Sequence, residues 1–310
     1  MLDYVFLIVG FVLLIKGADF FVEGSASVAK KFRIPSMIIG MTIVAMGTSA
    51  PECAVSIAAA LKGNNTMAIS NVVGSNIFNL MVVCGACALF TPLVVKRSTL
   101  RQEFPLSILA ALLLLTMGKM NLSIGRIDGV ILLAVFAVFL VWMVLEAKKA
   151  RSDTDREEEI AVMTGWQCLL YILVGIAAIV AGGDFVVDSA SAIAESFGLS
   201  PTLIGLTIVA FGTSLPELVT SLVAAKKGET DMALGNVIGS NIFNILLVLG
   251  AAGAISPMEV LMENLIDDVI LIGMSAVVWV FAWRRKQISR WHGIIMLAMY
   301  GGYMVYICIR

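Results

Sequence analysis

Ten long apolar stretches, separated by short polar segments, constrain what this sequence can fold into. A helix that crosses a bilayer needs about 20 mostly apolar residues, and most of the stretches reach that length. Hydrophobic residues make up 60% of the chain and charged residues 14%, which is too apolar for a water-soluble protein. The approximate stretches are 3–28, 36–61, 67–89, 104–118, 127–145, 165–193, 201–225, 232–253, 265–283 and 291–309. We therefore predict an all-α polytopic membrane protein with ten transmembrane helices.

The basic residues sort to one side of these predicted helices. If the loops are assigned alternately to two sides, 16 of the 21 Lys and Arg residues fall on one side and four on the other. Lys and Arg are enriched in cytoplasmic loops. We therefore expect a multi-pass protein of the cell (inner) membrane with both termini on the extracytoplasmic side. The polar segment 146–164 is then a cytoplasmic linker, because runs of charge are usually solvated.

Two segments of the chain repeat each other at a separation of 165 residues. The sequence GMTIVAMGTSAPE at 40–52 matches GLTIVAFGTSLPE at 205–217 at 10 of 13 positions. The sequence SNVVGSNIFN at 70–79 matches GNVIGSNIFN at 235–244 at 8 of 10 positions. The register is ungapped across both matches, which indicates an internal duplication.

Each half of the duplication contains five predicted helices, so the second half must enter the membrane from the opposite face. We expect two inverted-topology repeats, residues 1–145 with the motif 40–79 and residues 165–310 with the motif 205–244. Inverted repeats are typical of secondary transporters, whose binding site lies near the midplane where the two repeats meet.

The duplicated GTS-x-PE motif places one acid in the middle of each of two predicted helices. A carboxylate at that depth costs at least about 2.5–3.5 kcal/mol, so Glu52 and Glu217 are candidates for a functional site. The proline before each acid lacks an N–H and disturbs the preceding turn, which leaves nearby backbone carbonyls available as ligands. The neighbouring hydroxyls share the face of each acid if the helix continues; they belong to Thr48, Ser49, Thr213 and Ser214.

The second duplicated motif adds a polar stripe to each half. Asn71, Ser75 and Asn79 are spaced four residues apart and lie on one helix face, as do their repeat partners Asn236, Ser240 and Asn244. Hard oxygen ligands of these kinds suit Ca²⁺ and Na⁺, and no cluster of His or Cys favours a transition metal. A net charge of −1 gives no basic surface for nucleic acid.

These paired motifs resemble the α-repeats of the calcium/cation antiporter superfamily, most closely those of the prokaryotic sodium/calcium exchangers. The resemblance covers nearly the whole chain. It implies ten helices in inverted fives, with long first and sixth helices that slide across a central bundle. It also implies Na⁺-driven Ca²⁺ exchange by alternating access, with three Na⁺ for one Ca²⁺ as the favoured stoichiometry.

The same resemblance assigns roles to individual residues. It implies that Glu52 and Glu217 are the central carboxylates shared by Ca²⁺ and Na⁺, completed by Asn79 and Asn244. Some prokaryotic members carry Asp at the position of Asn244, so inferences from that acid do not transfer. The other implied ligands are the hydroxyls of Thr48, Ser49, Thr213, Ser214, Ser75 and Ser240 and the carbonyls of Ala45 and Ala210.

The sequence leaves other functions open. An antiporter coupled to H⁺ or K⁺ would use the same acids, and a cation channel could use them as a filter, although filters are usually rings around an open pore. A membrane scaffold that binds no ions is a further alternative. We expect a transporter rather than an enzyme, with no cofactor and no obligate protein partner beyond the lipid bilayer.

Overall fold

The structure is a computed structural model that describes residues 2–61, 66–152, 163–198 and 210–310. Within these residues, eight helices are long and apolar enough to cross a membrane, and a bent pair of helices can form a ninth span. The chain is therefore mainly helical with eight or nine candidate spans. The first part of the predicted span 201–225 lies outside the described residues.

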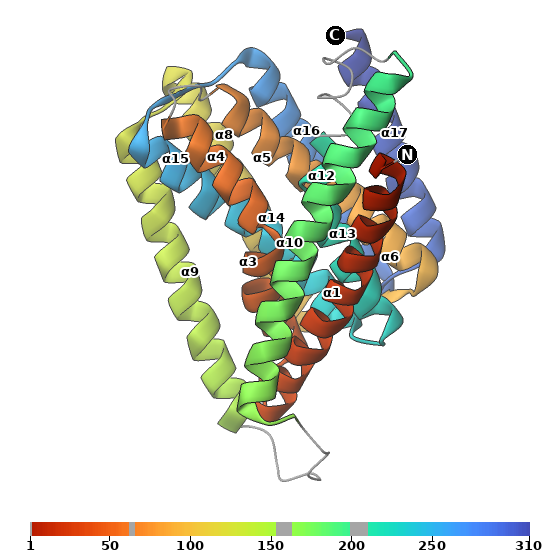
Figure 1. The fold of residues 1–310 in the computed structure, drawn as a ribbon. Coiled ribbons are helices and arrows are strands. Elements are labelled where there is room, and N and C mark those ends of the chain that lie inside the picture. The colour runs from red at the N-terminus through yellow and green to blue at the C-terminus, as the bar shows by residue number, and fades with distance from the viewer. Residues whose placement is uncertain (1, 62–65, 153–162, 199–209) are drawn as a thin grey trace.

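The N-terminal half contains two long peripheral helices, α1 and α9, and two spans that are divided into shorter helical pieces (Figure 1). Its elements are α1 (Leu2–Phe32), α2 (Ser36–Ile39), η1 (Gly40–Val44), α3 (Ala45–Thr48), α4 (Ala50–Leu61), α5 (Thr66–Phe78), η2 (Asn79–Val83), α6 (Cys84–Phe90), β1 (Leu93–Val94), α7 (Arg97–Arg101), α8 (Glu103–Asn121), β2 (Ser123–Ile124) and α9 (Arg126–Ser152). The η elements are turns of π-helix. They widen the backbone locally and are frequent at functional sites.

The C-terminal half has a similar order of elements. They are α10 (Gly165–Ser196), α12 (Ala210–Gly212), α13 (Leu215–Lys226), α14 (Thr230–Phe243), η4 (Asn244–Leu249), α15 (Gly250–Ile255), β3 (Met258–Glu259), α16 (Met262–Arg285), β4 (Gln287–Ile288) and α17 (Arg290–Ile309). Both chain ends lie away from the end of the bundle where α9 finishes and α10 begins (Figure 1).

Four two-residue strands form two small antiparallel ladders that were not predicted. In one ladder Leu93 of β1 is opposite Ile288 of β4, and in the other Ile124 of β2 is opposite Met258 of β3. Each ladder ties a connection of one half to a connection of the other. The all-α prediction missed them because two residues carry no periodicity that would indicate a strand.

The spans that carry the GSN motif form the centre of the protein. The apolar windows of 68–90 and 230–255 are each 78% buried, whereas those of the six other long helices are 17–39% buried. The peripheral helices leave many apolar side chains exposed on their outer faces, as contact with lipid requires. The duplicated polar motif is therefore enclosed by protein on the central helices.

Helices α1 and α10 lie side by side and antiparallel across the bundle (Figure 1). Their backbones touch at small residues: a Cβ added to Gly17 would lie 2.9 Å from the carbonyl oxygen of Gly175. A Cβ added to Gly175 would lie 2.7 Å from the backbone nitrogen of Phe21. Close backbone approach of this kind is a common way to pack helices in lipid, and it makes α1 and α10 one packing unit.

Candidate cation-binding site

Two equivalent helix breaks position the site. Helix α3 ends at Thr48 and α4 begins at Ala50, with a bend of 46° between the two parts of the span. The residue at the break, Ser49, has φ −84° and ψ 9°, and Ser214 at the equivalent break between α12 and α13 has φ −95° and ψ 5°. A proline follows each serine at the second position. Its missing N–H and its ring prevent a continuous helix there.

The breaks bring the two predicted acids into one polar cluster. Glu52 and Glu217 are fully buried. The hydroxyl of Ser49 donates to Oε1 of Glu217 at 2.8 Å, and the hydroxyl of Ser214 donates to Oε1 of Glu52 at 3.3 Å. Each serine thus contacts the carboxylate of the other repeat. The second oxygen of each carboxylate, Oε2, has no hydrogen-bond partner, and a buried anionic oxygen in that condition is costly unless a cation binds it.

The two predicted threonine ligands differ in their surroundings. The hydroxyl of Thr48 donates to Oδ1 of Asn236 at 3.1 Å, and the amide of Asn236 donates to Oγ of Ser221 at 2.9 Å. The same hydroxyl also lies 3.4 Å from the carbonyl oxygen of Ala45, at the longer of its two distances. Its one hydrogen serves these acceptors, and the lone pairs of its oxygen stay available for a cation. The hydroxyl of Thr213 is buried and has no hydrogen-bond partner.

The two predicted carbonyl ligands also differ. The carbonyl of Ala45 accepts the N–H of Ser49 at 3.0 Å, as in an ordinary helical turn. The equivalent N–H of Ser214 bonds instead to the carbonyl of Phe211 at 3.2 Å, one residue beyond Ala210. The Ala45 carbonyl is therefore not the unbonded carbonyl that was predicted. It accepts from Ser49 and lies 3.4 Å from the Thr48 hydroxyl, so an ion would share it with these donors.

Asn79 and Asn244 begin the two π-helical turns η2 and η4. Both asparagines are fully buried. Oδ1 of each has no hydrogen-bond partner, while the amide of Asn244 donates to Oδ1 of Asn76 at 3.1 Å. The serines one turn earlier, Ser75 and Ser240, are also buried, and the hydroxyl of Ser240 has no partner. The predicted stripes thus supply several oxygen atoms that no protein group uses.

A reciprocal asparagine pair, which was not singled out from the sequence, joins the two central spans. The amide of Asn76 donates to the carbonyl of Asn241 at 3.1 Å, and the amide of Asn241 donates to the carbonyl of Asn76 at 3.1 Å. These residues are 165 positions apart and belong to the duplicated GSN motif, so the motif already contained the signal. Ser221 was also missed, although its repeat partner Ser56 keeps the same spacing.

The cluster contains few acids. Among the residues that the structure describes, no group of three or more His, Cys, Asp and Glu side chains lies close enough to hold a metal ion. A cation at this site would therefore depend on two carboxylates supplemented by hydroxyl, amide and carbonyl oxygens. Such a mixed oxygen set is of the kind that binds Ca²⁺ in flexible geometries.

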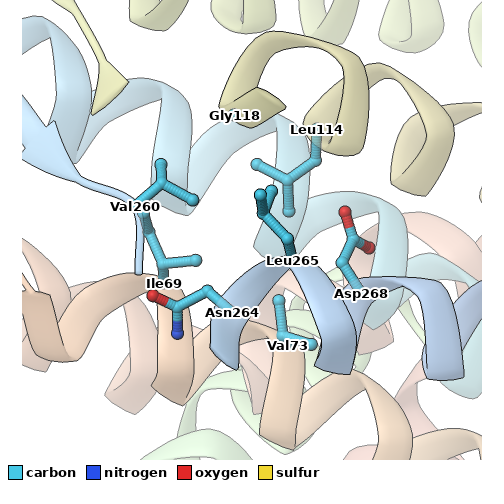
Figure 2. A pocket seen from close by; sticks show the side chains of 8 residues that line it. All are labelled: Ile69, Val73, Leu114, Gly118, Val260, Asn264, Leu265 and Asp268. Carbon is cyan, nitrogen blue, oxygen red and sulfur yellow. The ribbon is translucent and has the colours of Figure 1, made fainter. Parts of the chain in front are cut away.

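A further buried acid, also not predicted, lies outside the duplicated segments. Asp268 on α16 is 2% exposed, and neither of its carboxylate oxygens has a hydrogen-bond partner. It lines a cavity of about 10 Å³ between α5, α8 and α16 (Figure 2). Asn264 also lines this cavity, but its amide is committed to Ser70 at 2.7 Å. The remaining wall is aliphatic, so this cavity lacks the several oxygen ligands that Ca²⁺ needs.

Comparisons with known proteins agree with this geometry. A family model described as sodium/calcium exchanger protein matches residues 2–145 and 168–309. The putative antiporter CaxA of Alkalimonas amylolytica is 43% identical over 312 residues, which cover 96% of each chain. The sodium/calcium exchanger MaX1 of Methanosarcina acetivorans is 31% identical, with 98% of this chain and 97% of that protein covered. The solved structure of the sodium-calcium exchanger NCX_Mj soaked with zero Na⁺ and Ca²⁺ is similar with a TM-score of 0.86 and 32% identity, covering 100% of this chain and 99% of the other.

Proposed function

We infer that this chain, which belongs to the sodium/calcium exchanger family, is a secondary active antiporter that exchanges Na⁺ for Ca²⁺ across a membrane by alternating access. The observation that carries the proposal is the pairing of Glu52 and Glu217. Each acid is fully buried, each is held at Oε1 by a serine of the other repeat, and each has Oε2 without a partner. A cation between the two repeats would satisfy both orphaned oxygens.

The proposed architecture is ten transmembrane helices in two inverted repeats, residues 1–145 and 165–310, joined by the cytoplasmic linker 146–164. The two strand ladders support the alternation of sides. β1 and β4 belong to connections that this topology assigns to the cytoplasm, while β2 and β3 belong to connections assigned to the outside. Each ladder therefore joins loops of one side. In the proposal, the sorting of Lys and Arg decides which side is the cytoplasm, and it puts both termini on the extracytoplasmic face of the cell membrane.

The proposed ligands follow from the oxygen atoms that the protein leaves available. Glu52 and Glu217 bind both cations in turn, and Asn79 and Asn244 add amide oxygens. Additional Na⁺ positions use hydroxyl and carbonyl oxygens, because Na⁺ needs less negative charge than Ca²⁺. These come from Thr48, Ser49, Thr213, Ser214, Ser75, Ser240, Ala45 and Ala210.

The test is ⁴⁵Ca²⁺ uptake into Na⁺-loaded proteoliposomes. We expect Glu52→Gln and Glu217→Gln to abolish uptake, because each removes one of the two negative charges that offset Ca²⁺. Glu103→Gln is a matched control, since Glu103 is a buried acid on α8 that lies outside the cluster, and this variant should exchange normally. Normal uptake by either site variant would refute the assignment.

The same preparation separates the rival functions. Imposed Na⁺, H⁺ and K⁺ gradients, applied one at a time, identify the driving ion, and we expect Na⁺ alone to drive Ca²⁺ uptake. A cation channel would instead give unitary currents in a planar bilayer. A scaffold would bind neither cation.

A further inference from the structure

Two repeat-related hydrogen-bond triads surround the site, and in this structure one is formed while the other is not. The closed triad consists of Thr48, Asn236 and Ser221, linked by bonds of 3.1 and 2.9 Å. The open triad consists of the residues at the equivalent positions, which are Thr213, Asn71 and Ser56. In the open triad, Oγ1 of Thr213, Nδ2 of Asn71 and Oγ of Ser56 have no hydrogen-bond partner.

Burial of the two triads differs in the same sense. All three members of the closed triad are fully buried. In the open triad Ser56 is buried and Asn71 and Thr213 are partly exposed as residues, although the three unpaired polar atoms themselves are buried. The backbone next to Asn236 is tightly packed. A Cβ added to the neighbouring Gly235 would lie 2.6 Å from the carbonyl oxygen of Met37 on α2.

The asymmetry extends to the central asparagines. Asn244 donates to Oδ1 of Asn76 at 3.1 Å. The equivalent bond would run from Asn79 to Asn241, yet Nδ2 of Asn79 and Oδ1 of Asn241 both lack a partner. Identical residues at equivalent positions thus have two different hydrogen-bonding states, so the difference is one of conformation and not of composition.

The triads lie on opposite sides of the acids. Asn236 precedes Asn244 by eight residues, about 12 Å along a helix, toward the connection that contains Lys226 and Lys227. Ser221 approaches that same connection from α13. In the proposed topology this is the cytoplasmic side. The open triad lies at the equivalent positions between the acids and the end of α4 at Leu61, which the proposed topology assigns to the external side.

We propose that the two triads are alternating latches, so that the closed triad seals the cytoplasmic side here and the open triad forms in the cytoplasm-open state. Asn236 and Asn71 are then positioning residues that act through the ligand hydroxyls of Thr48 and Thr213. In each state, the formed triad holds its threonine with lone pairs toward the ion, and the other threonine is released on the side from which ions enter. This mechanism rests on the proposed exchange function.

The test compares the half-saturating Ca²⁺ concentration at the two faces. Right-side-out and inside-out membrane vesicles, loaded with Na⁺, expose the external and cytoplasmic faces to ⁴⁵Ca²⁺ in turn. Apparent affinity at each face scales with the fraction of protein open to that face. The ratio of the cytoplasmic to the external half-saturating Ca²⁺ concentration therefore reports the equilibrium between the two access states. A variant that weakens Ca²⁺ binding equally in both states leaves this ratio unchanged.

We expect Asn236→Ala to lower this ratio about fivefold, the effect of one lost hydrogen bond of typical net strength, because it weakens the cytoplasmic seal. Asn71→Ala should raise the ratio by a similar factor, and the double variant should return it toward the wild-type value. Ser221→Ala and Ser56→Ala should shift the ratio in the same two directions, and they replace the asparagine variants if those fail to fold. If these residues only stabilised the fold, the two variants of each repeat-related pair would change the ratio in the same direction.

Shifts in the same direction, or no shift, in variants that still exchange Ca²⁺ would overturn the latch. If the wild-type protein shows no Na⁺-dependent uptake, the proposed function fails separately. In that case, hydrogen–deuterium exchange tests the latch independently of transport. Asn236→Ala should raise deuterium uptake in 221–236 and lower it in 56–61 and 66–71, and Asn71→Ala should do the reverse. Equal responses of both regions would contradict the proposal.

Discussion

The proposed stoichiometry predicts how strongly membrane potential controls the Ca²⁺ gradient. Two buried glutamates give a charge of −2 when ionised, and the central asparagines add none. One Ca²⁺ then leaves the site neutral, whereas three Na⁺ leave it at +1. If three Na⁺ exchange for one Ca²⁺, the stoichiometry that the family resemblance favours, we expect one positive charge to cross the membrane per cycle in the direction of Na⁺ movement.

The magnitude follows from the energy of one charge in the membrane field. Moving one elementary charge through 100 mV is worth about 2.3 kcal/mol. A potential of about 60 mV is then worth about 1.4 kcal/mol, which is a tenfold change in the Ca²⁺ concentration ratio at equilibrium. With equal Na⁺ on both sides, an interior that is about 60 mV negative should lower internal Ca²⁺ about tenfold.

The assay uses proteoliposomes that contain a Ca²⁺ indicator. A K⁺ gradient with valinomycin sets the potential, and the same gradient without valinomycin controls for coupling to K⁺ itself. Glu103→Gln should behave like the wild type, since that acid lies outside the cluster. A Ca²⁺ ratio that does not respond to potential would indicate two Na⁺ per Ca²⁺ and refute the proposed three-for-one stoichiometry.

Two further predictions concern protons and stability. Acidification of the medium should raise the half-saturating Ca²⁺ concentration, because a proton on Glu52 or Glu217 removes one of the two charges that attract Ca²⁺; Ca²⁺ flux that is unchanged from neutral to acidic pH would contradict this. Asn76→Ala should lower the free energy of unfolding more than Asn241→Ala, by about 0.6 kcal/mol, because Asn76 makes two side-chain hydrogen bonds and Asn241 makes one. Denaturation with SDS in mixed micelles measures both variants, and an equal or reversed order would refute the bond count.

Hydropathy predicted the long helices well because transfer from water to lipid depends on composition over about 20 residues. The predicted stretch 165–193 corresponds to α10 at Gly165–Ser196, and 104–118 corresponds to α8 at Glu103–Asn121. The same averaging hides local features. Hydropathy gives no sign of the π-helical turns that begin at Asn79 and Asn244. Such turns depend on whether a backbone N–H bonds to the carbonyl four or five residues earlier.

The duplicated motifs identified which polar residues to examine, and the structure gathers most of them. The contacts of Ser49 with Glu217 and of Ser214 with Glu52 join residues that the sequence had assigned to one site. Their roles as cation ligands stay a prediction. The partners of Thr48 could not be predicted, because a repeat spacing identifies equivalent positions but not which of two equivalent hydrogen-bond sets is formed.

The hydrogen bonds around Asn76 give a physical reason for an amide at position 244. The amide nitrogen of Asn76 is committed to the carbonyl of Asn241, so its Oδ1 faces Asn244 and requires a donor. Asn244 supplies that donor and keeps its own Oδ1 free of protein partners. An ionised aspartate can only accept hydrogen bonds. At this position its carboxylate oxygen would face Oδ1 of Asn76 with no hydrogen between them, unless the side chain of Asn76 turned over and lost its bond to the carbonyl of Asn241. The amide at position 244 and the reciprocal asparagine pair therefore depend on each other. A chain that carries an acid at this position must either keep it protonated, so that its O–H donates to Asn76, or hold its two central spans together in another way.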